Sequence, residues 1–459
     1  MMKNKKFDYA MLGIIFALAW PTMLEQLMQT AVQYIDTAMV GTLGTDATAA
    51  VGATGTVNWL VMGVISALGV GFLATIAQAY GSGNQKIAKV IAAQAFTVTF
   101  IVGILFTVLM VSISKLVPVW MQVNQSIQDI AGRYFLIIYL PMLFRCATTI
   151  FGTLLRAVKD TKTPMKVGIL VNITNVILNF LFIYPTRTIA GFTVPGAGWG
   201  VIGAAVASAI SYVVGGVLIT MAAWRHPEIS PKGQSFKPRM DILKPCIKIA
   251  IPNMFQRFGT SLGYVVFASM INALGGIATA AHTIANTVES AFYIPGWGMQ
   301  ASAATLSGNA LGAKDNKRLK SLASTIIPLE VGLMIVSGGL LFIFAKPLVM
   351  IFSQSPEVIQ LGTTVLRMVA VSEPFYGVPI VVEGLMQGLG QTKIPLVYNV
   401  LGMWSVRIVG TFICTKFLGM GLVSAWACMI GHNLLLFFLF GYRYISGKWN
   451  PLNKEKLES

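Results

Sequence analysis

The sequence predicts an all-α polytopic membrane protein, with about twelve transmembrane helices arranged in two pseudo-symmetric bundles of about six. Three observations support this prediction. The chain of 459 residues is 55% hydrophobic and only 11% charged, whereas soluble domains are near a quarter charged. Apolar runs of about 20 residues, long enough to cross a bilayer, recur from one end of the chain to the other. The second half of the sequence also repeats the first.

The apolar runs are continuous, which favours helices over the short alternating strands of a membrane barrel. The mean hydropathy of the chain is +0.73. The first run is longer than the apolar region of a signal peptide and lacks a small-residue cleavage site, so no cleavable signal peptide is expected. The runs are centred near residues 25, 65, 100, 143, 173, 211, 257, 296, 332, 375, 404 and 432.

The basic residues are distributed unequally between the loops. The net charge is +17, and most Lys and Arg residues fall on one side if the helices alternate in direction. By the positive-inside rule, this distribution predicts a multi-pass protein of the cell membrane (the plasma or inner membrane) with both termini cytoplasmic. The basic excess therefore favours contact with anionic lipid over contact with nucleic acid. The opposite side holds only Lys115, Arg133, Arg187, Lys346 and Lys416.

Residues that would indicate an enzyme or a bound cofactor are scarce. The four cysteines form no CxxC pair, and the three histidines are scattered, which favours neither a disulfide framework nor a metal site. The sequence contains no Walker A loop. We therefore expect a protein that is not an enzyme, holds no cofactor and does not use ATP.

An internal repeat relates the two halves of the chain. The halves align without a gap from the pair Pro21 and Pro252 to the pair Pro164 and Pro395. LAWPTM (18–23) aligns with IAIPNM (249–254), AYGSGNQKIAK (79–89) with ALGAKDNKRLK (310–320), and RAVKDTKTP (156–164) with QGLGQTKIP (387–395). The first half carries an extra loop around 186–195. Beyond this loop, GWGVIGAAVA (198–207) aligns with GMGLVSAWAC (419–428), ten residues out of step. The repeat predicts an N-terminal lobe (1–224), a cytoplasmic linker (225–245) and a C-terminal lobe (246–459), as in many secondary transporters.

The sequence resembles the multidrug and toxic compound extrusion (MATE) family, in its bacterial, NorM-like branch. The motifs that carry this resemblance are LAWPTMLEQLMQTAVQYIDTAMVG (18–41), AQAYGSGN (77–84), RAVKDTKTP (156–164) and NVILN (175–179). Membership of this family implies a cation-coupled exporter of organic, often cationic, drugs, with two six-helix lobes that enclose a cleft.

A polar face on the first predicted helix ends in a carboxylate. Gln26, Gln29, Gln33 and Asp36 recur at helical spacing in an otherwise apolar segment. An ionised side chain inside a membrane helix is costly, so it is by default a functional residue. Asp36 is therefore expected to face a polar interior rather than lipid.

Two further predicted helices provide polar side chains at a similar depth. Asn172, Asn175 and Asn179 share one face of the helix centred near residue 173, and Ser208 lies on the next helix. A carboxylate with amide and hydroxyl oxygens suits Na⁺, and a protonated carboxylate would carry H⁺. The resemblance implies the same role for Asp36, Asn175, Asn179 and Ser208. Asn172 is either part of this site or a contact between helices.

Two other sets of residues are interpreted from their positions. Glu25 and Arg257 lie at matching depths on repeat-related helices, so they either form a cytoplasmic gate between the lobes or each pair within their own lobe. The expected substrate cleft includes Gln29, Gln33, Glu373 and Tyr376.

The function predicted from these features is a monomeric multidrug antiporter that exports amphipathic, cationic small molecules in exchange for Na⁺ or H⁺. The alternative is a lipid-linked saccharide flippase of a related fold, which would be expected to have a more basic cavity. Coupling is expected in the N-terminal lobe only, since the repeat places Phe267, Val406 and Gly410 opposite Asp36, Asn175 and Asn179. Glu373 and Glu383 leave a displaced second site open.

Overall fold

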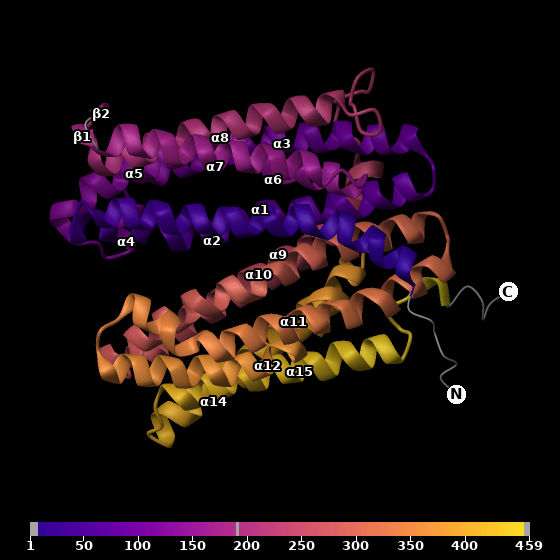
Figure 1. The fold of residues 1–459 in the computed structure, drawn as a ribbon. Coiled ribbons are helices and arrows are strands. Elements are labelled where there is room, and N and C mark those ends of the chain that lie inside the picture. Colours follow the sequence, from indigo (N-terminus) through magenta and orange to yellow (C-terminus); the bar gives the residue numbers. More distant parts are fainter. Residues whose placement is uncertain (1–7, 190–191, 454–459) are drawn as a thin grey trace. The chain divides into compact units, whose positions relative to one another are not determined.

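The computed structural model describes residues 8–189 and 192–453, and most of this part of the chain is helical (Figure 1). The two ends of the chain, 1–7 and 454–459, lie outside the described residues. The first half contains α1 (Tyr9–Gly41), α2 (Thr45–Gly81), α3 (Gln85–Ile113), α4 (Val117–Trp120), η1 (Gln125–Ile127), α5 (Gln128–Tyr139), α6 (Met142–Ala157), α7 (Lys162–Ile183), β1 (Pro185–Ile189), β2 (Phe192–Ala197) and α8 (Gly200–Arg225).

The second half is helical and includes two wide, π-helical turns, η2 and η3. Its elements are α9 (Met240–Asn272), α10 (Gly276–Gly312), α11 (Asn316–Phe352), α12 (Pro356–Gly388), α13 (Lys393–Leu401), η2 (Gly402–Ile408), α14 (Val409–Phe412), η3 (Ile413–Phe417), α15 (Leu422–Ile445) and η4 (Pro451–Asn453).

The helices fit the predicted polytopic membrane fold. Within the described residues, nine helices are long and apolar enough to cross a membrane, or ten if the bent pair Gln125–Tyr139 and Met142–Ala157 is one span. The helices α9 and α10 have 33 and 37 residues but are more polar. Counted together with α9 and α10, the candidate membrane spans match the prediction of about twelve transmembrane helices.

Repeat-related turns have the same local chemistry. Asn84 and Asp315 begin α3 and α11, and each side chain accepts a hydrogen bond from the backbone amide three residues later, at 3.1 and 2.9 Å. The residue before each cap, Gly83 or Lys314, has a positive φ of 73° or 52°. N-cap side chains satisfy backbone donors that a helix start leaves free. The repeat is therefore visible in the turns as well as in the sequence.

The chain packs as two compact units. Within the described residues, unit 1 consists of 8–23, Leu73–Gly83 and 247–453. Unit 2 consists of Leu24–Phe72 and Asn84–Cys246. The last division falls close to the end of the predicted linker, while the start of α1 and the end of α2 group with the C-terminal half.

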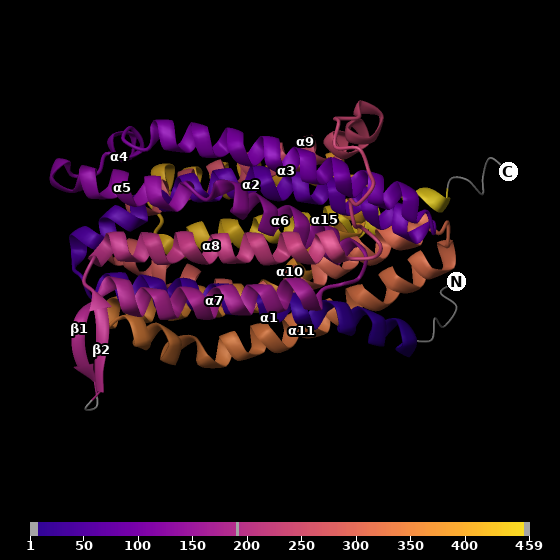
Figure 2. The same cartoon turned by 90° about the horizontal axis from the view of Figure 1, so that it is seen from above.

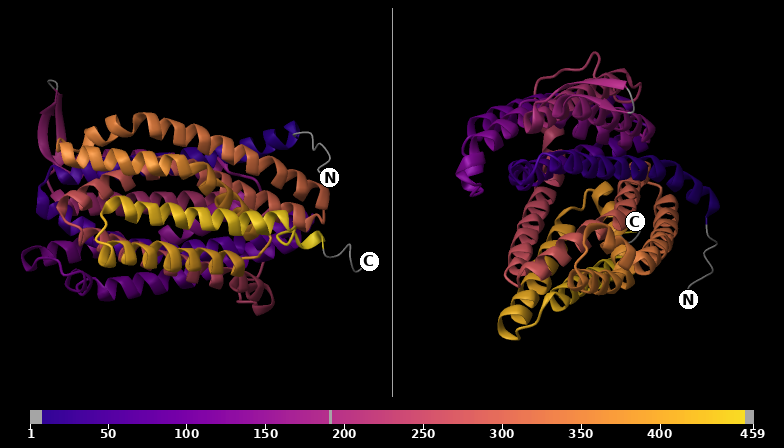
Figure 3. Two further views of the ribbon diagram at one scale, coloured as in Figure 1. Left: turned by 90° about the horizontal axis from the view of Figure 1, so that it is seen from below. Right: turned by 60° about the vertical axis from the view of Figure 1, so that its left-hand side comes forward.

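The start of α1 belongs to unit 1 because its apolar face is part of that unit's core. Ile15 and Ala19 are fully buried and pack in one cluster with residues of α10, α11, α12 and α15. The carboxylate of Asp8 also accepts a hydrogen bond of 2.6 Å from the Ser321 hydroxyl. Within this unit, α12 packs against α10, α11 and α15, and the orange and yellow ribbons of Figure 3 follow this arrangement.

In unit 2, α8 packs against α5, α6 and α7, and α3 packs against α6. The predicted extra loop around 186–195 forms the antiparallel hairpin of β1 and β2, which joins the end of α7 to the start of α8 (Figure 2). The close packing of α7 on α8 is visible at Gly203, where an added Cβ would lie 2.4 Å from the carbonyl oxygen of Phe182.

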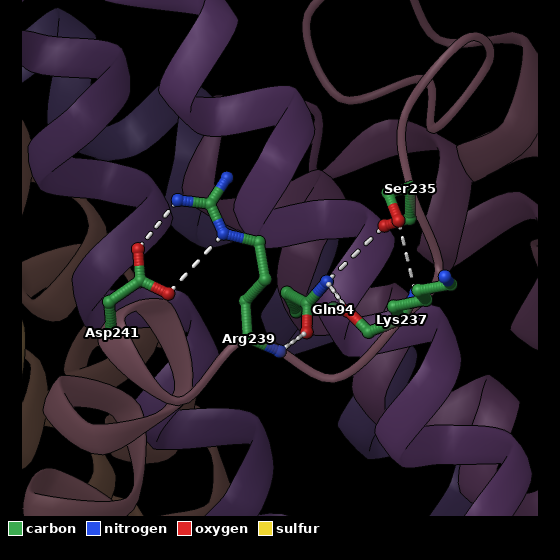
Figure 4. A network of polar contacts seen from close by, with 5 residues as sticks. All are labelled: Gln94, Ser235, Lys237, Arg239 and Asp241. Carbon is green, nitrogen blue, oxygen red and sulfur yellow. Dashed lines mark hydrogen bonds and ion pairs between the residues drawn. The ribbon is translucent and has the colours of Figure 1, made fainter.

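The predicted linker is fastened to α3 by a buried glutamine (Figure 4). Gln94 is fully buried, and its amide nitrogen donates to the carbonyl oxygens of Ser235 (3.3 Å) and Lys237 (3.0 Å). Its amide oxygen accepts from the backbone amide of Arg239 at 2.8 Å. Because one side chain satisfies three backbone groups, residues 235–239 are held against unit 2 rather than left as a free tether.

The end of α2 and the end of α10 meet in unit 1 through two repeat-related glycines. An added Cβ on Gly81 would lie 2.0 Å from the carbonyl oxygen of Asn309. An added Cβ on Gly312 would lie 1.9 Å from the carbonyl oxygen of Gln78. The gap-free alignment of the repeat relates Gly81 to Gly312 and Gln78 to Asn309, so the contact is symmetric under the repeat. Only glycine allows two backbones to approach so closely.

We predict that Gly81→Ala destabilises the protein by about 1–3 kcal/mol, because the new methyl group forces the two helix ends apart. The matched control is Gly13→Ala in α1, where nothing lies within 4 Å of the added Cβ and alanine favours the helix. Thermal unfolding of the purified protein in detergent measures both changes. Equal melting temperatures for the two variants would contradict the close packing at Gly81.

Candidate cation and substrate site

Unit 2 brings together the four residues predicted to bind the coupling cation. The side-chain nitrogen of Asn179 on α7 donates to the Asp36 carboxylate on α1 at 2.5 Å and to the Asn175 oxygen at 3.1 Å. Asn175 in turn contacts the Ser208 hydroxyl on α8 at 3.1 Å. Three helices therefore supply one carboxylate, two amides and one hydroxyl.

The amide orientation of Asn175 decides how many of these groups face the carboxylate. With the oxygen and nitrogen of this amide exchanged, its nitrogen donates to the two Asp36 oxygens at 2.8 and 3.1 Å, and its oxygen accepts from Ser208 at 3.1 Å. This orientation satisfies both ends of the Asn175 amide and takes the place of the hydrogen bond from Asn179 to the Asn175 oxygen, so that both asparagines donate to Asp36. The carboxylate is thus held by charge-assisted hydrogen bonds rather than by a cationic side chain.

One acceptor in this cluster has no partner. Asn179 is 1% exposed, and its side-chain oxygen is buried without a hydrogen-bond donor in the described part of the chain. An unpaired buried acceptor costs about 1–3 kcal/mol. The cluster therefore holds an oxygen that a cation can use, beside a carboxylate that is only partly buried.

Helix geometry explains why these four residues meet. Asn175 and Asn179 are four residues apart, which places them on one face of α7. The tight contact at Gly203 brings α8 onto α7, and Ser208 lies little more than one turn further along α8.

The other polar residues predicted on these helices are placed differently. Asn172 is 8% exposed, its side-chain nitrogen has no hydrogen-bond partner in the described residues, and it makes no hydrogen bond to the Asp36 cluster. Gln29 and Gln33 are exposed on α1. Their contact with a substrate stays a prediction.

A buried arginine near the cluster forms no salt bridge within the described residues. Arg145 on α6 is 6% exposed, donates to the side-chain oxygen of Asn58, and lies over the rings of Tyr139 (5.3 Å) and Tyr212 (4.7 Å). Tyr212 lies about one turn after Ser208 on α8, which places the guanidinium of Arg145 near the cluster. The tyrosines stabilise the guanidinium through cation–π contacts, which the sequence pattern does not reveal.

Glu383 and Glu373, the two acidic residues of unit 1 that the sequence singles out, differ in their contacts. Glu383 accepts hydrogen bonds from Gln256 (2.8 Å), Asn399 (3.0 Å) and Gln387 (3.0 Å). Glu373 is 1% exposed, so a bound molecule could contact its carboxyl group only after side chains or helices move.

Tyr376, also predicted in the substrate cleft, is partly buried and packs edge-to-face on Tyr293 at 6.0 Å. Glu373 and Tyr376, the two residues of unit 1 predicted to contact the substrate, thus lie against other side chains of unit 1. Their contact with a substrate stays a prediction.

Glu25 and Arg257 each have partners in their own unit. Glu25 accepts two hydrogen bonds from Arg156, at 2.6 and 2.8 Å, and both side chains are largely buried. Arg257 donates to Asn253 at 3.1 Å and interacts electrostatically with Glu383. These contacts correspond to the second arrangement that the sequence left open, and a gate between Glu25 and Arg257 stays a prediction.

Comparison with known proteins places the chain in a family. A family model described as MatE matches residues 21–181 and again 252–413. The two matches begin at Pro21 and Pro252, the first aligned prolines of the repeat, which confirms its register.

Relatives and solved structures are similar over nearly the whole chain. A "Probable multidrug resistance protein NorM" from Thermotoga maritima is 27% identical over 447 residues, which is 97% of this chain and 95% of the relative.

A structure described as "Crystal structure of MATE in complex with MaL6" superposes with a TM-score of 0.89, at 21% identity, and covers 96% of this chain and 97% of that one. Another, described as the outward-facing conformation of a multidrug resistance MATE family transporter of the MOP superfamily, has a TM-score of 0.88 at 21% identity and covers 98% of this chain and 100% of that one. The family model matches more than half of the chain, once in each repeat, and this protein therefore belongs to the MatE family, as its motifs predict.

Proposed function

We propose that the protein is a secondary active multidrug efflux antiporter, in which Na⁺ or H⁺ moving inward at the Asp36 cluster drives the export of amphipathic, cationic compounds. The observation that carries this proposal is the hydrogen-bonded group of Asp36, Asn175, Asn179 and Ser208. The name of the Thermotoga maritima relative, a probable multidrug resistance protein, supports drugs as the substrates.

The chemistry of the cluster suits a cation that must bind and leave in each cycle. Carboxylate, amide and hydroxyl oxygens are hard ligands, which favour Na⁺ over softer metals. The unpaired oxygen of Asn179 and the carboxylate of Asp36 supply a ligand and a counter-charge. If H⁺ is the coupling ion, it binds to the Asp36 carboxylate. The hydrogen bonds that the asparagines donate then differ in strength between the ionised and the protonated carboxylate.

Exchange follows from linkage between the two ligands. If the cation and the drug favour different conformations of the protein, binding of one promotes release of the other. The proposed orientation has both termini in the cytoplasm and the protein in the cell membrane, on the strength of the positive-inside distribution. The coupling cation would then enter from the outer side. The proposed substrate contacts are Gln29, Gln33, Glu373 and Tyr376.

We predict that Asp36→Asn abolishes cation-driven export while the protein still folds and inserts, because the amide keeps an oxygen for Asn179 but loses the charge. Efflux of a fluorescent cationic dye from vesicles, driven by a Na⁺ gradient and then by a H⁺ gradient, measures the change. It also identifies the coupling ion. The matched control is Asp46→Asn, an exposed carboxylate in the first turn of α2. Normal concentrative efflux by Asp36→Asn would exclude Asp36 as the coupling residue.

Loss of a single ligand should weaken cation binding rather than eliminate transport. Asn179→Ala is expected to raise the cation concentration for half-maximal efflux by about tenfold, equivalent to ~1.4 kcal/mol for one lost ligand. Asn172→Ala, on the same helix but outside the hydrogen-bonded group, should leave this concentration unchanged. The assignment of ligands fails if the two variants shift the cation dependence equally.

A further inference from the structure

The repeat identifies the place in unit 1 that corresponds to the cation cluster of unit 2. The gap-free alignment relates Asp36 to Phe267. Continued past Pro164 in the same register, it relates Asn175 to Val406 and Asn179 to Gly410. The separate alignment beyond the hairpin, of 198–207 with 419–428, continues from Ser208 to Met429. All four oxygen-bearing side chains have thus been replaced by residues without a side-chain oxygen: Phe267, Val406, Gly410 and Met429.

A guanidinium group fills this place. Arg407, the residue after Val406, lies with its Cζ atom 4.2 Å from the ring centroid of Phe267. Its Nη2 atom lies 2.9 Å from the sulfur of Met429. The arginine therefore touches the counterparts of both Asp36 and Ser208.

The surroundings of Arg407 keep a charge there without an ion pair. The side chain is 3% exposed and forms no salt bridge with a carboxylate of residues 8–189 or 192–453. The rings of Phe267 and Tyr264, the latter at 4.7 Å, stabilise the guanidinium through cation–π contacts. Arginine remains protonated in proteins, so this positive charge is permanent.

The backbone at Arg407 differs from its repeat counterpart. Residues Gly402–Ile408 form a π-helical turn, whereas α7 is a regular helix from Lys162 to Ile183. A π turn accommodates an extra residue and often marks a functional position. This local widening explains why the residue after Val406 reaches the site. The ionisable groups that interact with Arg407 from neighbouring elements are His282, Glu289 and Tyr293 on α10 and His432 on α15.

We propose that Arg407 is a built-in cation that permanently occupies, in the C-terminal half, the position at which the N-terminal half binds its exchangeable coupling cation. The C-terminal half therefore takes up no cation at this position, because a fixed positive charge is present there in every state, whereas the Asp36 cluster gains a positive charge only when it is loaded. This inference rests on the proposed function of the Asp36 cluster. Arg407 acts as a specificity-determining residue, because it restricts coupling to one of two duplicated sites.

The test places a carboxylate beside Arg407. The variants Phe267→Asp and Phe267→Asn have nearly the same size and both remove the ring, but only the aspartate can pair with the guanidinium. We expect the melting temperature of Phe267→Asp, at neutral pH in detergent, to be higher than that of Phe267→Asn by about 2–4 °C or more. With Arg407→Met added to each, this order should reverse, because the carboxylate is then buried without a counter-charge.

A second measurement tests whether replacement of Arg407, the built-in cation, creates a site that binds an exchangeable cation. In an Asp36→Asn background, Phe267→Asp with Arg407→Met should acquire a melting temperature that rises with Na⁺ concentration or as the pH falls. With Arg407 retained, the melting temperature of Phe267→Asp should not rise with Na⁺, and it should fall at low pH because protonation of the introduced carboxylate breaks its pair with the guanidinium. A Phe267→Asp variant no more stable than Phe267→Asn overturns the role of Arg407, even if the double variant does not fold. Equal cation dependence with and without Arg407 overturns it too.

These outcomes are separate from a failure of the proposed function. If cation binding by the otherwise unaltered chain survives Asp36→Asn, the Asp36 cluster is not the coupling site. Arg407 then has no exchangeable cation to replace, so that result overturns the inference at its premise. The comparison of aspartate with asparagine at position 267 tests the position of the charge alone.

Discussion

A carboxylate inside an apolar helical bundle must be stabilised by its neighbours, and the arrangement of unit 2 depends on how this is done at Asp36. A lysine or arginine beside Asp36 would form a permanent ion pair with it, and a transported cation could then not bind there. Asparagine amides instead donate hydrogen bonds that orient the carboxylate without cancelling its charge. The helix α7 supplies these amides four residues apart, and the close contact of α7 with α8 at Gly203 adds the hydroxyl of Ser208.

The two halves of the chain show that one scaffold can hold two different solutions to the same problem. The turns keep their caps and positive φ angles at repeat-related positions, and the glycines at the ends of α2 and α10 keep a symmetric contact. The charge-bearing positions have diverged, from a carboxylate with amides in one half to a guanidinium between aromatic rings in the other. Backbone packing constrains the scaffold in both halves, whereas the buried charge sets the function of each.

Much of this could be predicted from the sequence, because periodicity and depth along a helix are local properties. Helical spacing placed Asp36 at a depth similar to that of Asn175 and Asn179, and the structure joins these residues by hydrogen bonds. Partners distant in sequence could not be predicted in this way. Glu25 pairs with Arg156 because α1 and α6 meet in the folded unit, and neither residue has a local pattern that names the other.

Other features depend on backbone geometry or on tertiary packing. The π-helical turn Gly402–Ile408 has no sequence signature in a single chain, so the approach of Arg407 to Phe267 could not be predicted. The grouping of the start of α1 with the C-terminal half, and the attachment of residues 235–239 to Gln94, likewise follow from side-chain contacts that no spacing rule provides.

The measurement that tests the central claim most directly is the number of coupling cations bound by the purified chain in detergent, by titration calorimetry with Na⁺ and by proton release on drug binding. The account predicts one saturable cation per chain, displaced when a cationic drug is added and absent when Asp36 is replaced by asparagine. Two cations per chain, or one that remains after this replacement, would contradict a single exchangeable site at Asp36.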